Sequence, residues 1–364
     1  MGILRLILAI SVVLAHTSYI FGFGLVGGQA AVQAFYIISG FYMALVLNEK
    51  YIGENRSYKL FISNRLLRLL PIYWAVLLIT FLSSFASSII SSGDNFGKIQ
   101  VYFEYFDSMS ITTFLFLVFS NITLLFQDMV MFLGLDTTSG SLFFTSNFRN
   151  TTPQLHRFLL IPQAWTISIE IAFYLIAPFL VRKKLKFIFI FIFISILLRC
   201  LLILNGFYKD PWSYRFFPTE LLFFLLGIVA YNIYKKLKPL KIKTSYLYMI
   251  YVFILLFTLS YSFIPTKLKI IPYLFAIFFS TPFIFILSKK WKKDRYIGEL
   301  SYPIYISHMF IVYLVMYLKI PLVGGEGLVV TFITIIFSIF LNEFVAKKIE
   351  KIRQRRVKSI ANNI

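Results

Sequence analysis

The stretch that decides the fold runs from Ile3 to Phe21 and reads ILRLILAISVVLAHTSYIF. It is apolar and long enough to cross a membrane as a helix, yet it contains Arg5 and His16. Eleven residues separate them, or about three helical turns, so both side chains lie on one face and about 16 Å apart along the axis. Ionisable side chains in hydrocarbon are costly and normally face a bundle interior or a watery cavity. This pair therefore marks a candidate functional site.

The composition indicates a polytopic membrane protein. Hydrophobic residues make up 59% of the chain, 43 of its 364 residues are Phe, and the mean hydropathy is +0.81. The net charge of +21 comes from short basic clusters between apolar runs, which is typical of topology signals and excludes a nucleic-acid-binding surface. With one cysteine and three histidines, the sequence has no pattern for an intrachain disulfide or a metal site.

Eleven apolar runs are long enough to span a membrane if about 20 residues are required. They are 3–21, 31–48, 69–91, 111–134, 165–181, 186–205, 217–234, 245–263, 270–288, 300–318 and 326–346. The first has no small-residue cleavage site and is expected to remain as a span.

The basic clusters set the orientation, because Lys and Arg concentrate in cytoplasmic loops. The clusters are 182–186, 235–241, 289–295 and 347–356. All of them fall on one side only if one run does not cross, and 111–134 is the weakest because Ser, Asn, Thr, Gln and Asp interrupt it. We therefore predict an all-α integral membrane protein with about ten transmembrane helices, one re-entrant or interfacial segment, and both termini cytoplasmic.

This topology divides the chain into a membrane domain, 1–349, and a basic cytoplasmic tail, 350–364. Within the membrane domain, 92–164 forms one long extracytoplasmic region. Two interpretations of that region stay open: a solvated loop whose hydrophobic hairpin dips into lipid, and a binding site for an acceptor. His156, in the same region, is expected to be a surface residue.

The depth of polar residues suggests a catalytic pair. If the first span ends at Phe21, His16 lies about 8 Å below the outer surface, and Glu170 in the span 165–181 lies at a similar depth. A carboxylate beside an imidazole stabilises the imidazolium, so His16 would act as a general base toward a hydroxyl group. The alternative for each residue is an interhelical hydrogen bond with a structural role.

Arginines mark the opposite, cytoplasmic boundary. Arg65 and Arg68 are three residues apart, hence on one helical face, and Pro71 suits the start of a new helical segment. Guanidinium groups favour phosphates, and together with Arg5 they suggest an anionic cofactor that enters from the cytosol. The alternative is that these arginines only hold the orientation of the chain.

Five motifs in order resemble the membrane acyltransferase-3 family. They are the Arg5-to-His16 spacing, VQAFYIISGF (32–41), NRLLRLLPIYW (64–74), WTISIEIAFYLIAP (165–178) and GELSYPIYISH (298–308). Members of this family transfer acyl groups, commonly acetyl from acetyl-CoA, to hydroxyls of surface glycans such as lipopolysaccharide O-antigen, capsule or exopolysaccharide. The resemblance implies O-acetylation in the cell envelope, at the bacterial cytoplasmic (inner) membrane. It would make His16 catalytic and place Arg5, Arg65 and Arg68 at the acyl-donor site.

Further residues are candidates for the path between these two levels. Ser39, Ser301 and Tyr302 would line a shaft for the acyl donor, with Gly40 serving either the shaft or close helix packing. Candidate acceptor-binding residues on the outer side are Trp165, His308, Arg199 and Glu220. For Arg199 and Glu220 the favoured interpretation is an ion pair that holds consecutive helices together, and the alternative is a polar vestibule for a sugar.

The expected partners are acyl-CoA, a surface or lipid-linked glycan, and membrane lipids; no nucleic-acid partner is expected. Two questions stay open: whether the protein forms a homo-oligomer, and whether an acyl-histidine intermediate forms. A different class of function competes with acyl transfer. A proton-coupled transporter or flippase would also bind an anionic lipid or glycan at the arginines and relay protons through His16.

Overall fold

The computed structural model describes residues 1–52, 56–90 and 98–361. Nine helical segments in this part of the chain are long and apolar enough to cross a membrane. They contain α2 (Gly27–Glu49), α3 (Tyr58–Ile90), α6 (Trp165–Val181), α7 (Leu185–Leu204), α8 (Phe217–Leu237), α9 (Thr244–Ser260), α10 (Ile270–Ser288), α12 (Ser301–Tyr317) and α13 (Glu326–Leu341). The remaining α-helices are α1 (Gly2–Ala15), α4 (Gln100–Tyr105), α5 (Ile111–Thr123), α11 (Lys292–Glu299) and α14 (Lys347–Ala361).

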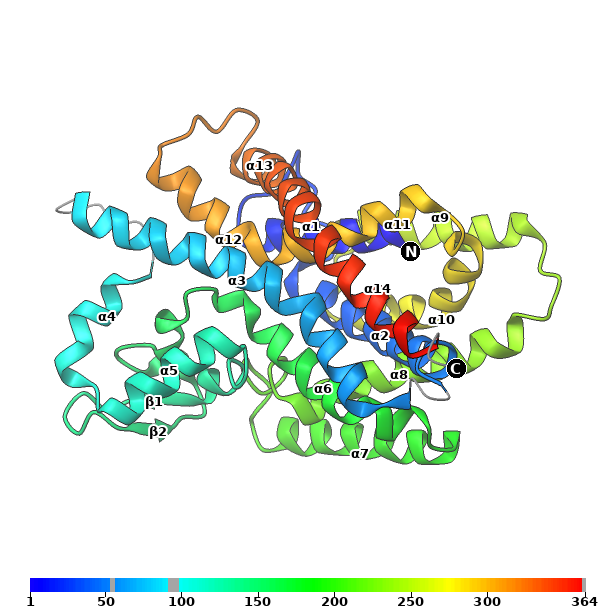
Figure 1. The fold of residues 1–364 in the computed structure, drawn as a ribbon, viewed down its shortest axis with the longest axis horizontal. Helices are drawn as coiled ribbons and strands as arrows, with labels where there is room; N and C mark the ends of the chain where they lie inside the picture. Colours follow the sequence, from blue (N-terminus) through cyan, green and yellow to red (C-terminus); the bar gives the residue numbers. More distant parts are fainter. Residues whose placement is uncertain (53–55, 91–97, 362–364) are drawn as a thin grey trace.

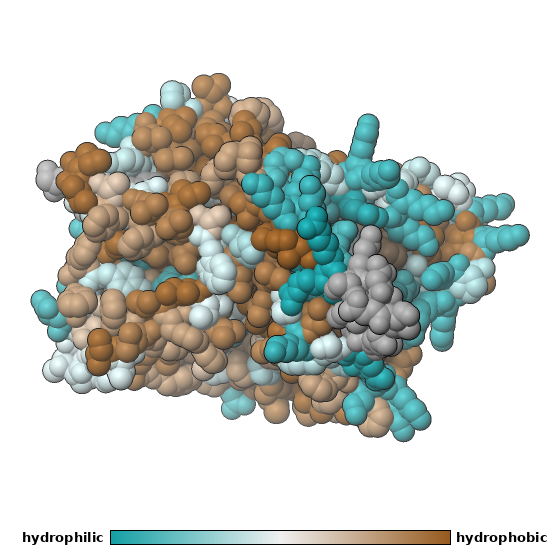
Figure 2. Space-filling model, in the orientation of Figure 1, coloured by the Kyte–Doolittle hydropathy of each residue, from teal (hydrophilic) through white to brown (hydrophobic). Residues whose placement is uncertain are grey.

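The fold is therefore an all-α polytopic membrane protein, as the sequence predicts. The described strands, β1 (Leu133–Leu135) and β2 (Leu142–Phe144), pair antiparallel in a small hairpin. The N-terminus and the helix α14 lie in the same half of the molecule (Figure 1), and Figure 2 shows hydrophilic side chains gathered over that half, around α14 and the connections beside α9 and α11. We call this half the basic end, after the clusters 182–186, 235–241, 289–295 and 347–356.

α1 is shorter than the predicted span 3–21. Polar side chains after Ala15 hydrogen-bond back to the helix: His16 Nδ1 lies 2.9 Å from the Val12 carbonyl oxygen, and Thr17 Oγ1 donates to the Val13 carbonyl at 3.1 Å. Such bonds compete with further helical hydrogen bonds. At 1.5 Å per residue, the 14 residues of α1 cover about 21 Å, and a non-helical segment connects them to α2.

The segment 111–134 does not form a spanning helix. It consists of the 13-residue α5, about 20 Å long, followed by a 3-10 turn and β1. Apolar side chains such as Ile111 and Leu115 are exposed on α5 and suit contact with lipid. Residues 92–97 of the predicted extracytoplasmic region and 362–364 of the predicted tail lie outside the described residues.

One detail of the helices differs from expectation. Pro71 lies inside the continuous 33-residue α3 and does not start a new segment. A π-helical turn, Asn342–Ala346, joins α13 to α14, and α14 packs against the first part of α3: Arg353 Nε donates to the Asn64 carbonyl at 2.8 Å.

Glycine brings two helices together at the centre of the bundle. A Cβ atom on Gly40 of α2 would lie 2.0 Å from the Phe224 carbonyl oxygen of α8, and one on Gly227 would lie 2.1 Å from the Ile37 carbonyl oxygen. Only glycine permits this backbone approach, so Gly40 serves helix packing. The close contact fixes α2, whose other face lines the cavities described next.

Candidate functional site

Three cavities follow one another through the helix bundle, starting from the basic end. We name the first the arginine cavity, the second the middle cavity and the third the histidine cavity. Neighbouring cavities share wall residues: Tyr42, Arg68 and Tyr302 line the first two, whereas Val32 and Tyr305 line the last two. The series thus leads from the basic end of the bundle to His16.

The arginine cavity has a volume of about 380 Å³ and lies between α3, α12 and α14. Its wall carries six basic side chains and two carboxylates, namely Lys50, Arg65, Arg68, Lys347, Lys351 and Arg353 with Glu299 and Glu350. Arg353 forms an ion pair with Glu350, and the Arg65 guanidinium lies over the Phe61 ring at 5.8 Å. Positive charge therefore exceeds negative charge in this wall.

The middle cavity is narrow, with a volume of about 110 Å³. Arg5 Nη2 donates to Ser301 Oγ at 2.8 Å, and Ser301 Oγ donates to the Gly298 carbonyl at 2.7 Å. The Asp294 carboxylate holds the start of α1 because it accepts from the backbone N–H groups of Gly2 and Ile3. These contacts join α1 to α11 and α12 and place the Arg5 guanidinium in the wall.

The expected candidates Arg5, Arg68, Ser39, Ser301 and Tyr302 all line the middle cavity, whereas Arg65 lines only the arginine cavity. Tyr302 OH donates to the Leu69 carbonyl at 2.8 Å, which ties α12 to α3. That contact gives Tyr302 a structural role beside its place in the cavity wall.

Glu170 also lines the middle cavity and does not contact His16. Its Oε1 atom accepts hydrogen bonds from Ser39 Oγ at 2.6 Å and from Tyr174 OH. The expected pairing is wrong because the helix that carries His16 ends at Ala15, not at Phe21. His16 instead lines a cavity with Trp165 at the start of α6, and Glu170 lies five residues further along α6, about 7.5 Å along the helix axis.

The histidine cavity has a volume of about 380 Å³, and both His16 and Trp165 line it. A carbonyl oxygen only accepts hydrogen bonds, so the contact between His16 Nδ1 and the Val12 carbonyl oxygen places the ring proton on Nδ1. Nε2 of a neutral His16 therefore carries the lone pair. An exposed imidazole held in this tautomer is suited to accept a proton from a bound hydroxyl group.

His308 packs directly against His16. The ring centroids are 5.0 Å apart, and His308 is fully buried. Its Nδ1 lies 2.7 Å from the Tyr305 carbonyl oxygen, so it also carries the proton on Nδ1, and its buried Nε2 has no hydrogen-bond partner among the described residues. His308 does not line the histidine cavity.

Sequence reasoning missed several side chains in the histidine cavity: Lys98, Arg149, His156 and Arg215. His156 is half-buried, which corrects the expectation of a surface residue, and burial and nearby cations lower its pKa to about 4. These basic residues lie far from the basic end, on the side where the usual distribution of Lys and Arg places few of them. That unusual position was the sequence signal that could have identified them. The segment 148–163 contributes several of the lining residues, so part of the predicted extracytoplasmic region 92–164 lines this cavity.

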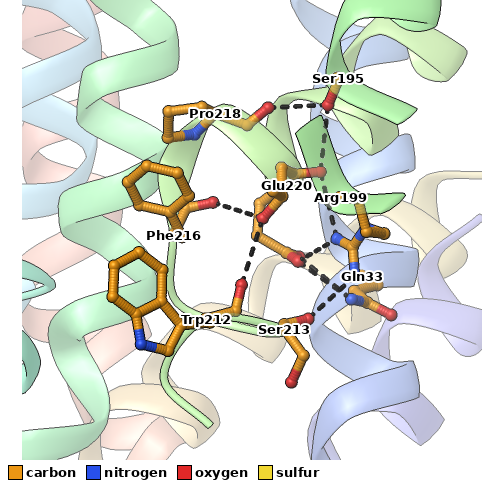
Figure 3. A network of polar contacts seen from close by, with 9 residues as sticks. Gln33, Ser195, Arg199, Trp212, Ser213, Phe216, Pro218 and Glu220 are labelled. Carbon is orange, nitrogen blue, oxygen red and sulfur yellow. Dashed lines mark hydrogen bonds and ion pairs between the residues drawn. The ribbon is translucent and has the colours of Figure 1, made fainter. Parts of the chain in front are cut away.

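Arg199 and Glu220 form a separate network (Figure 3). Arg199 Nη2 lies 2.7 Å from Glu220 Oε1, and Gln33 Nε2 donates to both carboxylate oxygens of Glu220 at 3.2 Å. Arg199 Nη1 also donates to the Ser213 carbonyl at 3.0 Å. The network joins α2, α7 and α8, and none of the three cavities is lined by Arg199 or Glu220, which supports the structural interpretation.

Comparison with known proteins identifies the family. Residues 1–343 match the family model described as an acyltransferase domain. Separate searches of curated proteins and of solved structures found no match. The match covers the middle and histidine cavities and the arginine cavity except for the residues from Ala346 onward, which include the whole α14 wall. The chain therefore belongs to the membrane acyltransferase-3 family and is a multi-pass membrane acyltransferase.

Proposed function

We propose that the protein is an acetyl-CoA-dependent O-acetyltransferase that modifies a surface glycan, such as O-antigen, capsule or exopolysaccharide, at the bacterial cytoplasmic membrane. The observation that carries this proposal is the series of cavities from a cationic chamber at the basic end to His16 near the other end. By the distribution of Lys and Arg, the basic end faces the cytosol.

The donor side fits a coenzyme A thioester. Its phosphates bind in the arginine cavity, where charge-assisted hydrogen bonds from guanidinium groups are strongest. Its pantetheine arm extends through the narrow middle cavity toward His16. The length of this arm is close to the axial distance between Arg5 and His16, which is about 16 Å. Glu170, Ser39 and Ser301 offer polar contacts to the amides of that arm.

The reaction needs one proton acceptor at the junction with the histidine cavity. A glycan hydroxyl gives its proton to His16 Nε2 while its oxygen bonds to the thioester carbonyl carbon. The carbon–sulfur bond then breaks, and the leaving sulfur takes the proton from His16. The products are the acetylated glycan and free CoA, and His16 returns to its neutral form.

Mass spectrometry of surface glycans tests this function in cells that lack the gene. Complementation with the wild type should restore an acetyl group on the glycan, and His16→Ala should not restore it at equal membrane abundance. Thr17→Ala is a matched control, because Thr17 makes a similar contact back to α1 but does not line the histidine cavity. Acetylation restored by His16→Ala would contradict the proposal.

A further inference from the structure

Basic side chains gather around the histidine cavity, at the end of the bundle opposite the basic end. Lys98, Arg149 and Arg215 come from three separate segments of the chain and all line this cavity. Its wall contains no aspartate or glutamate among the described residues. The arrangement is not explained by topology, because basic residues on this side oppose the usual distribution.

Part of this charge has no protein partner. Arg149 and Arg215 share one carboxylate, since Asp210 accepts from Arg149 Nη2 at 2.9 Å and from Arg215 Nε at 2.6 Å. A further contact from Arg215 Nη2 to Asp210 is 3.2 Å long, whereas Arg215 Nη1 has no hydrogen-bond partner among the described residues. Lys98 Nζ lies 5.5 Å from the centroid of the Tyr313 ring and forms no ion pair within the described part of the chain.

Arg215 is held in place by its surroundings. Its guanidinium lies 4.3 Å from the centroid of the Trp165 ring, and only 14% of its side chain is exposed. Stacking on an aromatic ring and pairing with Asp210 fix the orientation of a side chain that is otherwise flexible. A preorganised guanidinium of this kind binds an anion at a lower entropic cost.

The pKa of His156 reports the electrostatic potential in the same cavity. Burial is the largest cause of its lowered pKa, and the charges of Lys98, Arg215, Arg149 and Arg157 lower it further. The positive potential of these cations thus extends across the cavity to His156, which is not paired with any of them.

We infer that the acceptor is an anionic glycan whose carboxylate or phosphate group binds Lys98 and Arg215 beside His16. The inference rests on the proposed function, because it assigns the acceptor to the histidine cavity. Binding of the charged group there holds the sugar in the cavity that contains the catalytic imidazole. Carboxylate sugars and glycosyl phosphates share this chemistry, and the experiment separates them.

Calorimetry on the full-length protein in detergent tests the inference without any turnover. The probes are glucose, glucuronic acid and glucose 1-phosphate, each titrated at low salt. We expect the two anionic sugars to bind roughly 10- to 100-fold more tightly than glucose, as charge-assisted contacts imply, and the stronger of the two identifies the group. The difference should shrink at high salt because part of the site is exposed to solvent.

Variants locate the binding. Arg215→Gln and Lys98→Gln should each remove most of the preference for the anionic sugars, whereas the exposed Arg157→Gln, which loses the same charge outside the cavity wall, should keep it. Lys98→Gln breaks no ion pair within the described residues, so it keeps the test valid if Arg215→Gln disturbs the fold. Equal binding of all three sugars, or a preference that survives both substitutions, would overturn the inference. Failure of acyl transfer itself would appear separately, in the glycan analysis above.

Discussion

The rings of His16 and His308 lie 5.0 Å apart, one at the cavity wall and one fully buried behind it. Each ring points its Nδ1–H group at a carbonyl oxygen of its own helix, which fixes the tautomer of both. His308 makes no contact with the histidine cavity, so its influence on a reaction there must pass through His16. We regard it as a positioning residue.

Replacement of His308 should therefore slow the chemical step and leave donor binding unchanged. We expect His308→Ala to lower kcat by about 10- to 100-fold, because a loosened imidazole loses the alignment on which general-base catalysis depends. The KM for acetyl-CoA should stay the same, and the acid limb of the pH–rate profile should move. A parallel loss of donor affinity, with an unchanged pH profile, would indicate that His308 only supports the fold.

The arginine cavity gives a graded prediction for donor binding. Arg68 lines two cavities, whereas Arg65 lines one and is 3% exposed, so Arg68→Ala should weaken CoA binding more than Arg65→Ala. One lost charge-assisted contact of about 1.5–3 kcal/mol corresponds to roughly 10- to 100-fold in Kd. Calorimetry with CoA measures this, and the exposed Arg182→Ala at the same end is the control. Unchanged affinity in Arg68→Ala would leave these arginines with a role in topology alone.

The fold was largely predictable because hydrophobic length and charge distribution act locally. Long apolar runs between basic clusters identify the spanning helices, and the polar interruptions in 111–134 correctly remove that segment from the spans. The end of α1 was placed too far along the chain, because the apolar Ile20 and Phe21 follow the polar His16, Thr17 and Ser18. It depends on His16 and Thr17, whose side chains bond back to the helix.

That error of a few residues explains what the sequence could not reveal about the site. An incorrect end for α1 placed Glu170 level with His16, although Glu170 lies in the middle cavity with Ser39. The grouping of Lys98, Arg149 and Arg215 depends on how three distant segments pack, and no periodicity in the sequence reports this. The sequence alone identified the histidine and the arginines within single motifs. It could not identify the contacts between motifs.

The predicted extracytoplasmic region 92–164 should become less stable in mild acid because of His156. Its folded pKa of about 4 lies below the ordinary value near 6.5, so the unfolded state binds a proton that the folded state does not as the pH falls between these values. The stability that is fully present above pH 6.5 should fall by about 1–2 kcal/mol near pH 4, after allowance for the partly exposed ring. Thermal unfolding in detergent at pH 7.5 and 5 measures the change. His156→Gln should show a smaller difference between the two pH values, and an identical difference would assign the acid sensitivity to other groups.

The last prediction concerns the sides from which the two substrates approach. The arginine cavity lies at the basic end and the histidine cavity at the other, with the narrow middle cavity between them. At about 110 Å³ the middle cavity is the smallest of the three, so it suits the slender pantetheine arm better than a sugar ring. Donor and acceptor should therefore reach His16 from opposite faces of the membrane.

Sealed vesicles of known orientation allow a direct test. Acyl transfer should occur only when acetyl-CoA is on the face that carries the 182–186 and 235–241 clusters and the glycan is on the opposite face. Vesicles permeabilised with detergent serve as the control, because they should be active whichever side receives each substrate. Transfer with both substrates confined to the cluster face would contradict the arrangement, since the acceptor would then have to pass the arginines and the middle cavity to reach the imidazole.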